Sequence, residues 1–331
     1  MQLLCLSSRL TRCGSAPPGA LVLSLVSVIV AKDLVKRYGD FTAVDGIDFE
    51  IQEGESFGFL GPNGAGKSTT MRMVSAQSTR TAGKLEVLGL DTNDHGPEIR
   101  AQLGIVPQAD QLDEELRVFD NLTTYGRYFG FSRAHVRERA DELLDFAQLR
   151  EKKNVRVSEL SGGMKRRLTI ARGLMNSPKV FLLDEPTTGL DPQARHILWD
   201  RLFRLKEQGT TLVVTTHFMD EAEQLCDRLV VVDKGKIVAH GSPASLIREY
   251  SSREVLELRF GSAHNAAAAE QLQGVGDRLE LLPDRVLVYS ENGERALEEA
   301  TERGLVPNAT LVRRSSLEDV FLRLTGRSLI E

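Results

Sequence analysis

The stretch GFLGPNGAGKST, residues 58–69, decides the fold. It joins a short apolar run to a helical stretch, and four of its residues fit the pattern G-x-x-x-x-G-K-[ST]: Gly61, Gly66, Lys67 and Ser68. The glycines let the backbone curl so that its N–H groups and the start of the helix cradle phosphate oxygens. Lys67 can then reach the β- and γ-phosphates, and the Ser68 hydroxyl can bind Mg²⁺. The stretch therefore predicts a site for ATP and Mg²⁺.

Length and composition narrow the class of protein. The chain has 331 residues, enough for two domains of about 150 residues each. Its 42 Lys and Arg against 47 Asp and Glu give a net charge of −5, which argues against a broadly basic nucleic-acid-binding surface. We therefore expect no nucleic-acid partner. The three cysteines (Cys5, Cys13 and Cys226) are scattered and predict neither a disulfide framework nor a zinc site, so a reducing compartment is the default.

From residue 28 to about residue 250, short apolar runs alternate with helical stretches, which predicts an α/β domain. The expected strands are Val28–Leu34, Asp48–Ile51, Ser56–Leu60, Lys84–Leu88, Gln102–Val106, Val180–Asp184, Thr211–Thr215 and Leu229–Asp233. A charged stretch, Asp113 to about Lys153, instead has apolar residues at helical spacing: Val136, Ala140, Leu143, Leu144 and Ala147. It predicts a helical subdomain, at about residues 110–160, inserted into the α/β domain.

Residues 251–331 differ in composition, with ten Arg and no Lys, and predict a separate small α+β domain. We expect the order strand, helix, hairpin turning at Pro283-Asp284, helix, strand and a final helix, which is the split βαβ pattern with one helix added. The final helix has an apolar face made of Leu317, Val320, Phe321 and Leu324. That face either braces the subunit or its dimer, or belongs to the core of its own domain, and both alternatives stay open.

Residues 1–27 are predicted to be an extension, either a disordered arm or the product of a mis-assigned start codon. The apolar run at residues 20–31 has 12 residues, whereas a membrane span needs about 20. Its last part is better interpreted as the first strand of the folded domain. A signal peptide is the alternative, because Arg9 and Arg12 precede the apolar run. We expect that the chain itself does not conduct a substrate across a bilayer.

Two further segments supply polar groups for the ATP site. In VFLLDEP (180–186), an apolar strand delivers Asp184 to the carboxyl end of the sheet, where α/β folds bind ligands. Asp184 is placed to hold Mg²⁺, and Glu185 could orient a water against the γ-phosphate. In LSGGM, Ser161 is a plausible helix N-cap and Gly162 and Gly163 leave backbone N–H groups open to an anion. Two anion-binding helix starts with one Mg²⁺ carboxylate suggest that the second serves another subunit's nucleotide.

Six motifs in one order resemble the nucleotide-binding subunit of an ABC transporter. They are GPNGAGKS, GIVPQ, LSGGM, LLDEP, TGLD and TTHFMDEAE, and the resemblance covers Val28 to about Ala244. More narrowly, VPQADQLDEELRVFDNL, YGRYFG and the terminal LEDVFLRLTGR resemble the ATP-binding subunits of nodulation-factor exporters and, more loosely, drug-exporter ATPases of the ABC-2 class. Gln77 and Ser78 depart from the small, apolar helix end of these relatives.

The resemblance implies a role for each matching residue. Tyr38 would stack on adenine, Gln108 would sense the γ-phosphate and Mg²⁺ and face the permease, and His217 would contact the γ-phosphate and the attacking water. Asp191 would cross to a partner subunit. The expected catalytic residues are Lys67, Gln108, Glu185 and His217, and the expected Mg²⁺ ligands are Ser68, Gln108 and Asp184. The expected nucleotide contacts are Tyr38, Gly61, Pro62, Asn63, Gly64, Ala65, Gly66, Lys67, Ser68, Thr69, Ser161, Gly162, Gly163 and Asp191.

Three other classes of ATPase are weighed against an exporter subunit. Soluble translation or antibiotic-resistance factors carry two phosphate loops on one chain, and this chain has one. Chromosome-structure and DNA-repair ATPases insert a long coiled coil between the phosphate loop and LSGGM, the signature segment, whereas Lys67 and Ser161 are only 94 positions apart. An importer ATPase stays an alternative, although the LEDVFLRLTGR ending resembles the exporter class.

The resemblance implies an ATPase subunit on the cytoplasmic face of the cell membrane, bound peripherally to an ABC-2 type permease and paired head to tail with a second copy. The implied substrate is a lipo-chitooligosaccharide, with a hydrophobic drug or polyketide as the alternative. We expect the permease to contact the segment from Asp110 to Arg127, because Gln108 opens directly into it.

Overall fold

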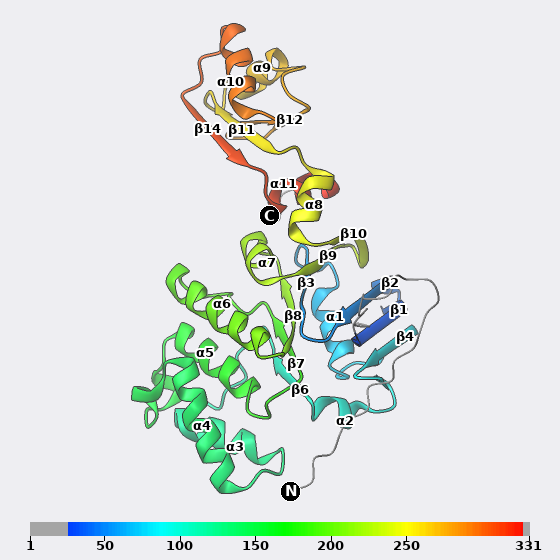
Figure 1. The fold of residues 1–331 in the computed structure, drawn as a ribbon, viewed down its shortest axis with the longest axis vertical. Helices are drawn as coiled ribbons and strands as arrows, with labels where there is room; N and C mark the ends of the chain where they lie inside the picture. Colours follow the sequence, from blue (N-terminus) through cyan, green and yellow to red (C-terminus); the bar gives the residue numbers. More distant parts are fainter. Residues whose placement is uncertain (1–25, 327–331) are drawn as a thin grey trace, which may run out of the picture.

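A six-stranded sheet positions the phosphate loop in the computed structural model, which describes residues 26–326 (Figure 1). Its strands, in the order β10-β9-β3-β8-β7-β6, are β10 (Lys236–Gly241), β9 (Arg228–Asp233), β3 (Ser56–Leu60), β8 (Thr211–Thr216), β7 (Val180–Asp184) and β6 (Leu103–Val106). All neighbours pair in parallel except β10, which is antiparallel to β9. The carboxyl ends of the parallel strands therefore meet at one edge.

Both faces of this sheet are buried, as is typical of parallel sheets. Along β7, Phe181 and Leu183 join one apolar core, and Val180 and Leu182 join the core on the opposite face. This alternation follows from the two-residue period of a strand. The predicted bounds of β3 and β7 match the structure, because each is a short, continuous apolar run.

An antiparallel sheet packs beside the central one. In the order β2-β1-β4-β5, its strands are β2 (Phe41–Gln52), β1 (Ser27–Tyr38), β4 (Ala82–Val87) and β5 (Leu90–Asp91). The predicted strands were too short for β1 and β2, because register shifts interrupt the apolar alternation that the prediction followed. Strands β5 and β10 were not predicted, since β5 has two residues and β10 is half-exposed.

Helices cover both faces of the central sheet. They are α1 (Lys67–Val74), α2 (Gly96–Arg100), α3 (Val118–Arg127), α4 (Arg133–Ala147), α5 (Gly162–Gly173), α6 (Pro192–Glu207), α7 (Met219–Leu225) and α8 (Pro243–Tyr250). Helices α3 to α6 lie on the side of the central sheet away from the antiparallel sheet (Figure 1). The prediction of helices after residue 113 is confirmed, and the five apolar positions given for α4 are all buried.

The C-terminal region forms a third sheet with the predicted order of elements. Its strands, in the order β12-β13-β11-β14, are β12 (Arg278–Leu281), β13 (Val286–Ser290), β11 (Glu254–Arg259) and β14 (Ala309–Arg314). Helices α9 (Asn265–Gln271) and α10 (Gly293–Glu302) cover one face, and α11 (Leu317–Thr325) follows β14. The split βαβ pattern is therefore confirmed.

Helix α11 packs against the ATPase core. Leu317, Val320 and Phe321 join the same apolar core as Leu246 of α8 and Ala222 of α7. The Leu317 N–H also donates to Glu223 Oε1 of α7 at 2.6 Å. Of the two alternatives for this face, the structure supports bracing of the subunit. A different residue of α11, Leu322, joins the cluster on the C-terminal sheet.

Candidate ATP site

The phosphate loop joins β3 to α1, and two of its glycines occupy places that no side chain could share. A Cβ on Gly61 would lie 2.1 Å from the Val232 carbonyl oxygen, and one on Gly66 would lie 2.4 Å from that of Ala43. Gly66 also has a φ of +105° where it caps α1, a conformation that favours glycine. The two glycines are therefore required by close backbone contacts as well as by the phosphate cradle.

Lys67 is buried at the base of the loop. Its Nζ donates to the carbonyl oxygens of Gly61 at 2.7 Å and Pro62 at 2.9 Å. Burial lowers the pKa of Lys67, while the charges of Glu185 and Asp184 act in the opposite direction. The two carbonyls hold the ammonium where an arriving phosphate would offer a stronger, charged partner.

Asp184 lies at the carboxyl end of β7 and faces α1. Its Oδ1 accepts a hydrogen bond from Ser68 Oγ at 3.2 Å and another from Thr215 Oγ1. A hydroxyl and a carboxylate side by side suit Mg²⁺, which is commonly held by one or two carboxylates together with substrate phosphates and water. Residues 26–326 contain no group of three or more His, Cys, Asp or Glu side chains arranged to hold a metal.

Glu185 is the point at which three predicted residues meet. It is buried, with a φ of +47° that its backbone hydrogen bond to Thr215 O at 3.0 Å supports. Its Oε2 accepts from Gln108 Nε2 at 3.0 Å and from Thr188 Oγ1 at 3.2 Å, and its Oε1 lies 3.1 Å from His217 Nδ1. Residues after β6, β7 and β8 thus converge on one carboxylate, as expected for side chains at the carboxyl edge of one sheet.

A cavity of 320 Å³ connects these groups. It is lined by Phe41, Ala43, Asn63, Gly64, Gly66, Lys67, Ser68, Thr69, Gln108 and Glu185. Pro62 and Ala65 shape the loop from behind, since the Ala65 N–H donates to the Pro62 carbonyl at 3.2 Å. The structure therefore brings together the phosphate loop, Gln108 and Glu185 around one space.

The signature segment and Asp191 lie elsewhere on the surface. Ser161 caps α5 by accepting from the Met164 N–H at 3.3 Å, and Asp191 caps α6 by accepting from the Ala194 N–H at 2.8 Å. Ser161, Gly162 and Asp191 are exposed and Gly163 is half-buried. Of the described residues that line the cavity, none comes from 161–163 or is Asp191. Within one chain, these predicted contacts are not assembled with the phosphate loop.

The aromatic residue that lines the cavity is Phe41, not Tyr38. The two residues pair across the tip of the β1–β2 hairpin, where Tyr38 is 48% and Phe41 63% exposed. Lys36 Nζ lies 4.9 Å from the centroid of the Tyr38 ring, so it covers that ring in part. The sequence interpretation missed Phe41. Only its place opposite Tyr38 across a tight turn could have indicated it.

Arg166 is a second residue that sequence reasoning missed. Its buried guanidinium donates to the carbonyl oxygens of residues 184, 185 and 186 at 2.8 to 2.9 Å, and to those of Pro107 at 2.5 Å and Gln108 at 3.2 Å. Burial lowers the pKa of Arg166, and Asp110 opposes that effect. Arg166 thus ties α5 to the segments that carry Gln108 and Glu185. It stands in a run of three basic residues, and only packing distinguishes it from its neighbours.

The chain is similar to known protein families over both of its regions. Residues 44–188 match the ABC transporter family model, and residues 265–326 match the C-terminal domain of the nodulation factor export protein NodI. A Nod factor export ATP-binding protein I from Rhizobium etli is 46% identical over 305 residues, covering 92% of this chain and 95% of the relative. One from Ralstonia nicotianae is 44% identical, covering 95% and 98%.

The chain belongs to the family of the Nod factor export ATP-binding proteins, within the ABC transporter ATPases. Like the other members of this ATPase class, it is an ATP-hydrolysing transport protein.

Solved structures agree with this family. A dimeric ATP-binding cassette in a post-hydrolysis state, bound to ADP and Pi, superposes with a TM-score of 0.61 at 29% identity, covering 65% of this chain and 98% of that one. A second cassette in its ADP conformation gives a TM-score of 0.61 at 26% identity, covering 68% and 94%. The predicted fold class, a nucleotide-binding domain of the phosphate-loop type with an added α+β region, is thereby confirmed. Within residues 26–326, no helix has the length and apolar character needed to cross a membrane.

Proposed function

We propose that this chain energises export of a Nod factor, a lipo-chitooligosaccharide, through a separate ABC-2 type permease, to which it binds at the cytoplasmic face of the cell membrane. The observation that carries the proposal is the convergence of Gln108 and His217 on Glu185 beside the phosphate loop. The match of residues 265–326 to the NodI C-terminal domain, and the names of the relatives, support the substrate class. Residues 28–250 would form the ATPase domain and residues 251–331 the accessory domain.

The site residues have distinct roles in the proposed reaction. Residues 61–69 cradle the phosphates, and Lys67 exchanges its backbone carbonyl partners for phosphate oxygens. Mg²⁺, held by Ser68, Asp184 and Gln108, would neutralise charge on the phosphates. Glu185 orients the attacking water in line with the γ-phosphate, and His217 contacts the same region from the other side of the carboxylate. Tyr38, with its exposed ring, stacks on adenine.

Two chains arranged head to tail would complete two such sites. The start of α5, at Ser161, Gly162 and Gly163, is accessible for a nucleotide held by a second chain. Asp191, at the start of α6, is also exposed. ATP binding would close the pair and hydrolysis would release it. The difference in dimer affinity between the ATP and ADP states is then the free energy that can drive the permease.

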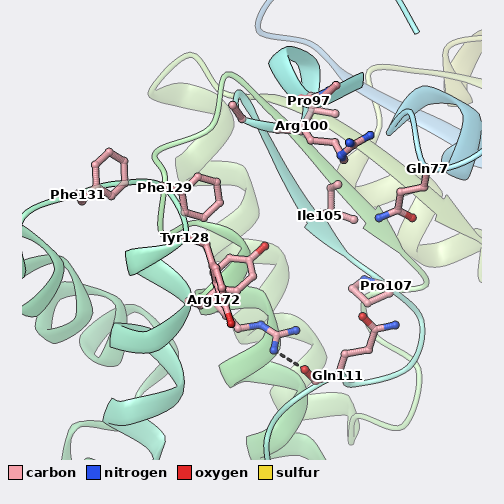
Figure 2. Close-up of a pocket in the computed structure, with 13 residues that line it drawn as sticks. Gln77, Pro97, Arg100, Ile105, Pro107, Gln111, Tyr128, Phe129, Phe131 and Arg172 are labelled. Atoms are coloured by element: carbon pink, nitrogen blue, oxygen red, sulfur yellow. Dashed lines mark hydrogen bonds between the residues drawn. The ribbon is translucent and has the colours of Figure 1, made fainter. Parts of the chain in front are cut away.

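A groove beside the ATP site supports the proposed permease contact. Its volume is 680 Å³, and it lies between α2, β6 and the segment that follows α3 (Figure 2). Figure 2 shows Tyr128 and Arg172 on one side and Arg100 and Gln77 on the other, with Arg172 bonded to the Gln111 carbonyl. Aromatic and arginine side chains around a concave surface are typical of binding sites for protein segments. We therefore extend the expected contact, Asp110–Arg127, to include this groove.

Crosslinking tests the contact directly. A single introduced cysteine at Tyr128, which is 82% exposed, should crosslink to a cytoplasmic segment of the permease in membranes that contain both proteins. A cysteine at Val306, which is 84% exposed in the C-terminal region, is the matched control and should not. Crosslinks from Val306 with none from Tyr128 would contradict the assignment.

The Glu185→Gln variant tests the catalytic role and the dimer together. The amide keeps the shape of the side chain but lacks its negative charge, so ATP should bind while turnover falls by at least about 100-fold. The trapped protein should elute as an ATP-bound dimer in size-exclusion chromatography with Mg-ATP, preferably with the permease present. Glu207→Gln, an exposed acid at the end of α6, is the control and should hydrolyse ATP at the parent rate. Turnover by Glu185→Gln at the parent rate would remove Glu185 from the catalytic role.

The substrate class is tested with the permease. Inside-out vesicles that contain both proteins should accumulate a labelled lipo-chitooligosaccharide when ATP is added, and should not do so when the ATPase carries Glu185→Gln. Transport of a hydrophobic drug without transport of the lipo-chitooligosaccharide would replace the Nod factor proposal with the drug-exporter alternative.

A further inference from the structure

A fully buried carboxylate lies directly behind the ATP site and takes no part in the chemistry described above. Glu221 is on α7, one turn after His217, and its exposed fraction is 0%. Its carboxylate faces the hydroxyls of Thr216 and Thr187 and the indole N–H of Trp199. The positive charge of Arg195 favours the ionised form of Glu221. Within the described residues, neither Glu221 oxygen, the Thr187 hydroxyl nor the Trp199 N–H has a hydrogen bond of normal geometry.

The three donors belong to three different segments of the site. Thr187 stands two residues after Glu185, and Thr216 immediately precedes His217. Trp199 is on α6, the helix that begins directly after Asp191. One side chain therefore faces the segments that carry the proposed water-orienting residue, the γ-phosphate contact and the residue that crosses to the second subunit.

A second connection between α6 and the segment after His217 is made by Arg195. Arg195 of α6 lies 3.5 Å from Asp220 of α7 and 4.9 Å from the ring centroid of Phe218, which follows His217. Arg195 Nε is itself buried without a hydrogen bond among the described residues. Helices α6 and α7 are thus joined by an ion pair near their N-terminal ends, which follow Asp191 and His217 in the chain.

Packing alone does not require an acid at this position. A buried carboxylate costs free energy unless donors compensate it, and burial raises the pKa of Glu221 to about 7. An apolar residue of similar volume would fill the same space without that cost. What the carboxylate offers, and an apolar residue does not, is two oxygens that can accept from several donors at once.

We propose that Glu221 is a positioning residue that holds the segments of Glu185, Asp191 and His217 in their relative places for hydrolysis. The inference rests on the proposed roles of those three residues. Glu221 does not line the phosphate cavity, so it acts through its neighbours and not on ATP. Its loss should slow turnover and leave ATP affinity unchanged.

The test compares variants of the full chain in a steady-state ATPase assay. Glu221→Gln keeps the volume but replaces one acceptor oxygen by an NH₂ group, which meets donors with donors. We expect its kcat to fall by about tenfold or more, because small displacements of reacting groups are costly, while KM for ATP stays within about twofold. Its melting temperature at pH 8 should equal or exceed that of the parent, since the variant buries no charge. Glu207→Gln, an exposed acid at the end of the neighbouring helix α6, is the matched control and should keep kcat within about twofold.

Two outcomes would overturn the inference. A Glu221→Gln protein with the parent kcat has no positioning acid at this site. A protein in which kcat, ATP affinity and melting temperature all fall together has lost its fold, and the role is then structural only. Glu185→Gln in the same assay separates this inference from the proposed function. If Glu185→Gln is inactive and Glu221→Gln is not, only the positioning role is wrong, whereas an active Glu185→Gln contradicts the proposed chemistry itself.

Discussion

The ATP site and the C-terminal sheet both bury charged side chains, but they differ in how completely those charges are paired. In the C-terminal sheet, Arg313 donates to Asp319 at 2.7 and 2.9 Å and to Glu257 at 2.6 Å, and Asp319 also accepts from the Tyr289 hydroxyl at 3.2 Å. Burial opposes ionisation of both Arg313 and Asp319, yet their mutual hydrogen bonds raise the pKa of Arg313 and lower that of Asp319. The charges of Arg313, Asp319 and Glu257 are thus paired with one another.

At the ATP site, two buried charged groups, Lys67 and Glu221, have weaker or missing partners, unlike Arg166 and Glu185. Among the described residues, Lys67 donates to two backbone carbonyls and has a lowered pKa, and Glu221 has no hydrogen bond of normal geometry. Fully paired buried charges stabilise one structure. Incompletely paired ones are typical of functional sites, where a charged ligand can supply the missing partner. The comparison predicts that changes at the ATP site slow catalysis, whether or not they also lower stability, and that changes in the C-terminal sheet act on stability alone.

Arg166 should show the largest effect, and its substitution tests the predicted difference between the ATP site and the C-terminal sheet most directly. Arg166→Ala leaves five carbonyl oxygens without their donor, beside both Gln108 and Glu185. We expect kcat for ATP to fall by about 100-fold and the free energy of unfolding to fall by about 3 kcal/mol, measured by ATPase assay and urea denaturation. Arg167→Ala, one position along α5, should change kcat by less than about threefold. Equal effects of the two variants would show that Arg166 has no special connection to the site.

Asp319 tests the opposite half of the comparison. Asp319→Asn leaves Arg313 buried beside a neutral partner and should lower the free energy of unfolding by about 3 kcal/mol, with kcat within about threefold of the parent. Because the folded pKa of Asp319 is lowered, the stabilisation is present above its unfolded pKa and is lost as the pH falls below that value. Denaturation at pH 7 and pH 3 should therefore differ less for the variant. A loss of ATPase activity as large as that of Arg166→Ala would break the comparison.

The pH dependence of stability at Glu221 provides a further test of the comparison between the two regions. Its pKa is raised from 4.5 to about 7 in the folded protein, so the un-ionised acid is favoured on folding. The stabilisation is complete below pH 4.5 and is lost as the pH rises through about 7. Three other titratable groups interact electrostatically with Glu221: Arg195, Arg166 and Cys226.

We expect Glu221→Gln to match the parent in thermal stability at pH 5 and to exceed it at pH 8, by at most about 3 kcal/mol. Thermal unfolding across this range measures the difference, and Glu207→Gln serves as the control with a parent-like profile. A constant difference between Glu221→Gln and the parent at all pH values would contradict the assigned ionisation.

Phe41 should show the smallest effect. The ring lines the phosphate cavity at the tip of the β1–β2 hairpin, largely exposed, so its removal costs contact with the nucleotide but little packing. Phe41→Ala should weaken ATP binding by about three- to tenfold, or roughly 1 kcal/mol, as measured by calorimetry, with an unchanged melting temperature. Phe203→Ala, an exposed aromatic on α6, is the control. Unchanged ATP affinity would leave Tyr38 as the aromatic contact.

Residues within one motif could be predicted because their chemistry is local. The phosphate loop between β3 and α1 needs glycine at Gly61 and Gly66 whatever the rest of the chain does, and Asp184 follows from an apolar strand that must end at the ligand edge of a parallel sheet. The helices of residues 118–147 and the order of the C-terminal elements also follow from periodicity alone. Strands β5 and β10 did not, since short or half-exposed strands carry little periodic signal.

The sequence by itself determined the ATP-binding chemistry and the order of the elements, because both depend on residues close together in the chain. Only the tertiary structure decided that Arg166 reaches the carbonyls of two loops, that Glu221 faces Thr187 and Trp199, and that α11 covers Leu246. These contacts join segments far apart in sequence, and the angles at which helices pack on the sheet determine which side chains meet. The same packing places the signature at Ser161 away from its own phosphate loop.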